Sequence, residues 1–151
     1  MTVDTSQPSD NPVHIKLYLG RQFKRILREL EPFDPDRYSG WRFRWCGSKR
    51  GHTFYGTRKV TVPRWTLKYG RDFALAYLLH EVAHLVGYSD HGDGFRDYEE
   101  TLLSLYGLSI VRRPRSKNGY AEKIVRGLPK EENRANDRTT RLSAGLPRRK
   151  P

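Results

Sequence analysis

The sixteen residues from His80 to Phe95 read His-Glu-Val-Ala-His-Leu-Val-Gly-Tyr-Ser-Asp-His-Gly-Asp-Gly-Phe. Residues four apart on an α-helix lie on one face, one turn above each other, so His80 and His84 can converge on a single ion. Glu81 is turned by about 100° from His80 around the helix axis and can reach a water on that ion without being a ligand. Catalytic zinc sites use three protein ligands and one water. The stretch therefore predicts two ligands and a base, and it requires a third ligand.

The candidates for the third ligand are, in order of preference, His91, Asp90, and the pair Glu99 and Glu100. His91 comes soon after a glycine that would end the helix and let the chain turn back toward the metal. Asp90 stands where the metzincin pattern H-E-x-x-H-x-x-G-x-x-H places its third histidine, but no methionine follows for a Met-turn. The ring nitrogens of the ligands that face away from the metal also need partners, for which Asp90, Asp93 and backbone carbonyls are the candidates.

The composition favours one polar, intracellular domain. The chain has 151 residues, of which 36% are hydrophobic and 30% are charged. A single cysteine, Cys46, excludes a disulfide framework within the chain and fits a reducing compartment. The first residues lack a basic start and an apolar run, so they do not form a secretory signal, and no segment approaches the roughly 20 apolar residues of a membrane span. We therefore expect a cytoplasmic protein without a membrane partner, which we take to be monomeric.

Charge and composition divide the chain into three parts. We expect a disordered N-terminus over residues 1–12, a folded domain over 13–111, and a basic, largely disordered tail over 112–151. The net charge is +12, and residues 111–151 carry 13 Lys and Arg against 4 Asp and Glu. Such a tail attracts polyanions, so DNA is a candidate partner. The alternative is a solvated tail with no partner.

Hydrophobic periodicity predicts an α+β fold. We expect helices over 13–30, 72–86 and 95–106, strands over 41–45, 52–55 and 59–62, and a last extended segment over 108–111. Three short sequential strands favour an antiparallel sheet. Aromatic residues alternate with arginines from Trp41 to Trp45, which indicates one buried and one wet face, although these rings could instead stack on nucleobases.

The motif His80-Glu81-x-x-His84, followed by His91-Gly92-x-x-Phe95, resembles the signature of the SprT-like (Spartan-type) zinc metallopeptidases. The similarity covers about residues 13–108, and its specific part is the sixteen residues quoted above. The resemblance implies a minimal zincin-like metallopeptidase core in which the three histidines bind Zn²⁺ and Glu81 is the catalytic base. A zinc ribbon often follows this core in the family, and the present chain lacks the cysteines for one.

The resemblance implies a zinc-dependent metallopeptidase that hydrolyses peptide bonds of a protein or peptide substrate through a zinc-bound water activated by Glu81. Eukaryotic members of the family act on proteins attached to DNA, so we expect action near nucleic acid. An edge strand at 59–62 could hold an extended substrate, and Tyr88 could stabilise an oxyanion. The alternative is a non-catalytic nucleic-acid-binding accessory protein with a structural metal site. Glu81 discriminates between the two, because a structural site needs no base.

Overall fold

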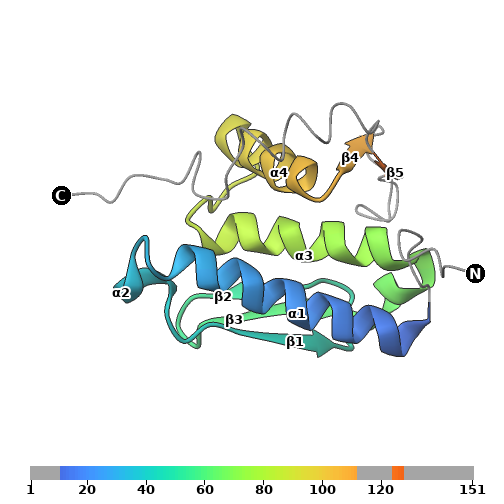
Figure 1. Ribbon diagram of the computed structural model, residues 1–151, viewed down its shortest axis with the longest axis horizontal. Coiled ribbons are helices and arrows are strands. Elements are labelled where there is room, and N and C mark those ends of the chain that lie inside the picture. The colour runs from blue at the N-terminus through green and yellow to red at the C-terminus, as the bar shows by residue number, and fades with distance from the viewer. Residues whose placement is uncertain (1–10, 112–123, 128–151) are drawn as a thin grey trace, which may run out of the picture.

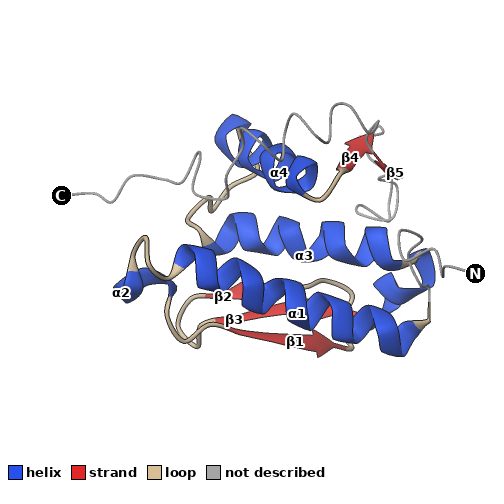
Figure 2. Cartoon of the chain, viewed as in Figure 1, coloured by secondary structure: helices blue, strands red, loops and turns tan. Residues whose placement is uncertain are grey.

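The computed structural model describes residues 11–111 and 124–127 and confirms the predicted α+β class (Figures 1 and 2). The elements in chain order are α1 (Pro12–Leu30), α2 (Pro35–Tyr38), β1 (Arg42–Cys46), β2 (Thr53–Phe54), β3 (Lys59–Pro63), the 3-10 helix η1 (Arg64–Tyr69), α3 (Arg71–Leu85), α4 (Asp93–Leu105), β4 (Leu108–Val111) and β5 (Ile124–Gly127). The predicted disorder of residues 1–10 and of most of the tail lies outside the described residues, whereas Asn11 and Pro12, which were predicted to be disordered with them, cap and begin α1. Residues 124–127 are the described part of the tail, and they pair with β4 as an antiparallel strand.

The first helix forms where its apolar periodicity predicts. The side chain of Asn11 accepts a hydrogen bond from the backbone N of Val13 at 2.9 Å, and proline occupies the first turn. Both features favour a helix start. One face of α1 is buried, and its members are Ile15, Leu19, Phe23, Ile26 and Leu30. Basic side chains on the opposite face are exposed, so α1 covers the core with a solvated outer side.

The sheet is mixed, and the prediction of an antiparallel sheet is wrong. Its strand order is β1-β3-β2, with β1 parallel to β3 and β2 antiparallel to β3. The tight turn over residues 55–58 makes β2 and β3 a hairpin as predicted. However, β3 lies between the other two strands, so the predicted edge strand at 59–62 is central. Among the described strands, β1 and β2 are the outer strands of this sheet.

The connection after β1 explains this order. Twelve residues separate Cys46 from Lys59, which is long enough for a crossover between parallel strands. The loop before β2 is anchored to the segment after β3, because the indole N of Trp65 donates to the carbonyl of Lys49 at 2.8 Å. The backbone N of Gly51 also donates to the Tyr77 hydroxyl at 2.9 Å. These contacts direct the chain to the far side of β3.

One face of the sheet is apolar and packs against the helices. Trp41 is 7% exposed, and Phe43 and Trp45 pack against the core. The ring of Phe43 lies 5.9 Å from that of Phe23 on α1. These contacts confirm the prediction that the aromatic side of the first strand is buried. The alternative, that these rings stack on nucleobases, is not supported.

Helix α3 is the central element of the molecule. Figure 1 shows it between the sheet and α4, and it contacts both. Twelve of its fifteen residues are buried, because neighbours cover it on several sides. The chain leaves the helix at Gly87, which has a φ of 126° that glycine adopts without steric cost. No helix within the described residues is both long and apolar enough to span a membrane.

Candidate metal centre

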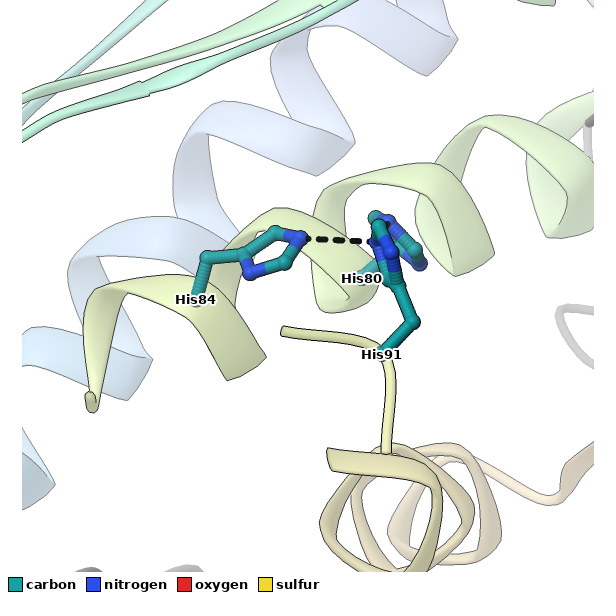
Figure 3. A group of neighbouring side chains, drawn as sticks. All are labelled: His80, His84 and His91. Atoms are coloured by element: carbon teal, nitrogen blue, oxygen red, sulfur yellow. Dashed lines mark hydrogen bonds between the residues drawn. The ribbon is translucent and has the colours of Figure 1, made fainter. Parts of the chain in front are cut away.

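Three histidines converge at the C-terminal half of α3. His80 and His84 project from consecutive turns of the helix, and His91 approaches them from the following loop (Figure 3). The Nε2 atom of His91 lies 3.1 Å from Nε2 of His84 and 3.2 Å from Nε2 of His80. The three residues offer ligand atoms that all lie within 4.8 Å of one another and could hold a metal ion. The structure thus brings together the three histidines that the sequence pattern selects.

The loop after α3 selects His91 over Asp90. Gly87 donates from its backbone N to the carbonyl of His84 at 3.0 Å, which closes the helix end. The chain then reverses toward the helix and carries the imidazole of His91 back to it. Asp90 is instead used within the loop, where its Oδ1 accepts a hydrogen bond from the backbone N of Gly92 at 3.1 Å. It is not a member of the metal-holding group.

Both helix histidines are oriented by acceptors behind them. Nδ1 of His80 lies 2.7 Å from Oε2 of Glu99, and Nδ1 of His84 lies 2.7 Å from the carbonyl O of Tyr88. A carbonyl only accepts, so Nδ1 of His84 carries a proton and its Nε2 presents a lone pair. The carboxylate of Glu99 favours the same tautomer for His80. Of the partners expected for the ring nitrogens, a backbone carbonyl is found at His84. Glu99, which was considered as a third ligand, instead bonds to the ring of His80.

The donor set fits a tetrahedral metal ion. Zinc bound by imidazole at about 2.0–2.1 Å in tetrahedral geometry places ligand nitrogens about 3.3 Å apart, close to the two Nε2 distances given above. His80 and His84 present lone pairs, and one proton on His91 can satisfy only one of them. A cation at the centre satisfies every lone pair at once.

Phe95 forms an apolar wall behind the site. Its ring centroid lies 4.8 Å from that of His80, 4.6 Å from that of His84 and 4.9 Å from that of His91. Phe95 is buried in the first turns of α4, whereas His84 is partly exposed and His91 is exposed. The group is therefore closed by hydrophobic packing on one side and open to solvent on another.

Glu81 is a buried carboxylate held by the sheet. It is 4% exposed, and the hydroxyl of Thr53 on β2 bonds to its backbone carbonyl at 2.9 Å and to Oε1 at 3.1 Å. The pKa of Glu81 is raised to about 7, chiefly by burial; the hydrogen bond from the Thr53 hydroxyl lowers it, and the negative charge of Glu99 contributes a smaller increase. The hydroxyl of Tyr55, just after β2, donates to the carbonyl of His84. The end of β2 is thus tied to the same two turns of α3 that carry the histidines.

Sequence reasoning did not find the roles of Thr53, Tyr55 and Glu99. Thr53 lies on a short strand far from the motif in the sequence and Tyr55 directly follows that strand, and no spacing rule links either residue to the motif. A signal for Glu99 does exist, because it is a carboxylate within the apolar stripe of α4, where it is 0% exposed. Tyr88 contributes its carbonyl, and its ring packs 5.5 Å from that of Tyr98.

Comparisons of the chain with protein-family models, with curated proteins and with solved structures found no match. The interpretation of the site consequently depends on its own geometry.

Proposed function

We propose that the protein is a zinc-dependent metallopeptidase that hydrolyses peptide bonds of a protein substrate. The observation that carries the proposal is the convergence of His80, His84 and His91 beside the buried carboxylate of Glu81. The resemblance of these residues to the SprT-like signature supports the same activity. Three imidazole ligands suit Zn²⁺, which when bound would polarise a carbonyl and activate a water.

The number of ligands favours catalysis over a structural role. Structural zinc sites are closed by four protein ligands, whereas catalytic sites keep one position for water or substrate. Within the described residues the group contains three histidines, one of which is exposed. A non-catalytic accessory protein would have no use for an open position, nor for a carboxylate next to a ligand.

Glu81 is the proton carrier in the proposed reaction. The Thr53 hydroxyl bonds to Oε1, so we assign Oε2 as the atom that takes a proton from the attacking water. The same oxygen then passes the proton to the amine that leaves when the peptide bond breaks. Thr53 fixes the orientation of the carboxylate, and the hydrogen bonds behind His80 and His84 fix the directions of their rings.

The edge of β2 is the best candidate for binding an extended substrate. Among the described strands only β3 pairs with β2, so its other edge has unpaired backbone groups. Thr53 and Tyr55 contact α3, so this edge lies beside the helix that carries His80 and His84. An extended peptide could add to it by backbone hydrogen bonds, with its scissile bond directed toward the histidines.

A Glu81→Gln variant tests the proposal. Elemental analysis of purified protein should find zinc bound at close to one ion per chain in both the wild type and the variant, since Glu81 is not a ligand. Cleavage of a fluorescently labelled unfolded protein should fall by about 10²–10⁴-fold in the variant.

Glu100→Gln is the matched control, because it removes an exposed carboxylate from the neighbouring helix, and it should keep full activity. The proposal fails if the purified chain holds no zinc, or if Glu81→Gln cleaves the substrate as fast as the wild type.

A further inference from the structure

The segment that builds the sheet has an unusual charge distribution. Residues 37–71 contain ten Lys and Arg and no Asp or Glu. Some of these cations contact other groups of the chain. The guanidinium of Arg58 donates to the backbone carbonyls of Ser39 and Asp36, and that of Arg71 lies near Asp72. Others, including Arg42 and Arg44 on β1, are exposed, and no acidic residue within the segment offsets them.

Strand alternation places these exposed cations on one face of the sheet. Phe43 and its β3 partner Val60 point toward the helices, because Phe43 contacts α1 and Val60 is fully buried. Successive side chains on a strand point to opposite faces. Arg42 and Arg44 therefore lie on the face opposite α1 and α3, and so does Lys59, which is paired with Arg42.

An exposed aromatic ring lies in the same row. Phe54 on β2 is paired with Lys59, so Arg42, Lys59 and Phe54 form one row across all three strands. The Lys59 ammonium sits 5.0 Å from the centroid of the Phe54 ring, and the exposed imidazole of His52 lies 5.6 Å from it. Phe54 remains 42% exposed. Solubility alone would not favour a large aromatic ring exposed to solvent among the cations.

We propose that this outer sheet face, formed by Arg42, Arg44, His52, Phe54 and Lys59, binds single-stranded nucleic acid. Single-strand binding surfaces combine cations that follow the phosphates with aromatic rings on which bases stack. The arginines and Lys59 supply the first element, and Phe54 supplies the second. Three strands make a face about 10 Å across, the distance between its two outer strands, which suits one strand of nucleic acid.

The aromatic ring distinguishes this partner from other polyanions. An anionic polysaccharide would contact the cations but would gain little from stacking on Phe54. The face lies on the opposite side of the sheet from Glu81 and the histidines, since Thr53 and Val60 on the other side of the same strands point toward α3; it shares only strand β2 with the proposed substrate edge. Nucleic-acid binding should therefore require neither the metal nor Glu81.

Fluorescence anisotropy with a labelled oligothymidylate of about 15 nucleotides tests the proposal on the full chain. Arg42→Ala/Arg44→Ala should reduce the slope of log affinity against log salt by about 1.4, which corresponds to two phosphate contacts on a single strand. Phe54→Ala should weaken binding by at least about fivefold, and Phe54→Leu should do the same, because neither residue offers a ring for stacking.

The matched control is Arg25→Ala/Arg28→Ala, which removes two exposed arginines from α1. Like the sheet variant, it removes two positive charges and leaves the tail unchanged. Its salt slope should stay much closer to that of the wild type than the slope of the sheet variant does. Binding should also persist in EDTA and in the Glu81→Gln variant, whatever the outcome of the peptidase assay.

Three results would overturn the proposal. In the first, the full chain does not bind the oligonucleotide at low salt; in the second, the sheet and α1 double variants weaken binding equally. In the third, both Phe54 variants bind as the wild type does while heparin competes through the arginines, which would identify a general polyanion surface.

Discussion

Glu99 shows how one buried side chain can set the properties of the candidate metal centre. It is 0% exposed and lies 2.7 Å from Nδ1 of His80, so it fixes the tautomer and the ring direction of that ligand. Loss of such a partner typically lowers metal affinity by about 10–100-fold. We expect Glu99→Gln to lower zinc affinity within that range, because the amide carries no charge to support the imidazole. Competition with a chromophoric chelator measures the effect. Glu100→Gln on the exposed side of α4 should bind zinc as the wild type does, and equal affinities for all three proteins would contradict the assigned role.

The residues of the metal centre differ in how far the sequence could predict them. His80 and His84 follow from helical spacing, which is local, and His91 follows from the glycine that ends the helix. Thr53 contacts Glu81 from 28 positions away in the sequence, and Glu99 contacts His80 from 19 positions away. Such contacts depend on how the elements pack, so no local pattern reveals them. A carboxylate or carbonyl partner for each ligand was predicted, and for His80 and His84 these partners are Glu99 and the carbonyl of Tyr88 rather than Asp90 or Asp93.

At the scale of elements, the loop between β1 and β2 depends on a glycine at position 51. A Cβ there would lie 2.2 Å from the carbonyl O of Thr61 and 2.8 Å from Cε1 of Tyr77. We expect Gly51→Ala to lower the free energy of unfolding by about 3 kcal/mol, because backbone and a packed ring must both move. Gly20→Ala is the control, since a Cβ there meets no atom within 4 Å. It lies within α1 and should stabilise the protein by up to about 1 kcal/mol. Urea unfolding followed by circular dichroism measures both, and a neutral Gly51→Ala would contradict the close packing of this loop.

The same loop explains why the strand positions were predictable and the strand order was not. Alternation and turn residues located β1, β2 and β3 to within a few positions. The order depends on where the chain crosses, which is set by the hydrogen bonds of Lys49 and Gly51 to Trp65 and Tyr77. Those two aromatic residues belong to η1 and α3. The arrangement of the sheet therefore depends on η1 and α3, the two elements that follow it in the chain.

At the scale of the whole molecule, buried tyrosines should make the fold sensitive to alkali. Burial raises the pKa of Tyr77 and of Tyr106 from 10.0 to about 12. A phenol whose pKa is higher in the folded state than in the unfolded state contributes its full stabilisation at pH values below the unfolded-state pKa. This contribution is lost as the pH rises through the folded-state pKa. Stability should therefore be level up to about pH 10 and then fall between about pH 10 and 12. Each such tyrosine should contribute about 1.4 kcal/mol per pH unit to the fall.

Tyr77→Phe separates this effect from general alkaline unfolding. At neutral pH the variant should lose about 1 kcal/mol, because the hydroxyl no longer accepts the hydrogen bond from Gly51. Between about pH 10 and 12 its stability should fall less steeply than that of the wild type, since one ionisable phenol is gone. Tyr69→Phe is the control, because that ring is 53% exposed, and its stability should follow the wild-type curve. Urea unfolding across this pH range gives the slopes, and parallel curves for Tyr77→Phe and the wild type would show that burial of this phenol does not link the fold to pH.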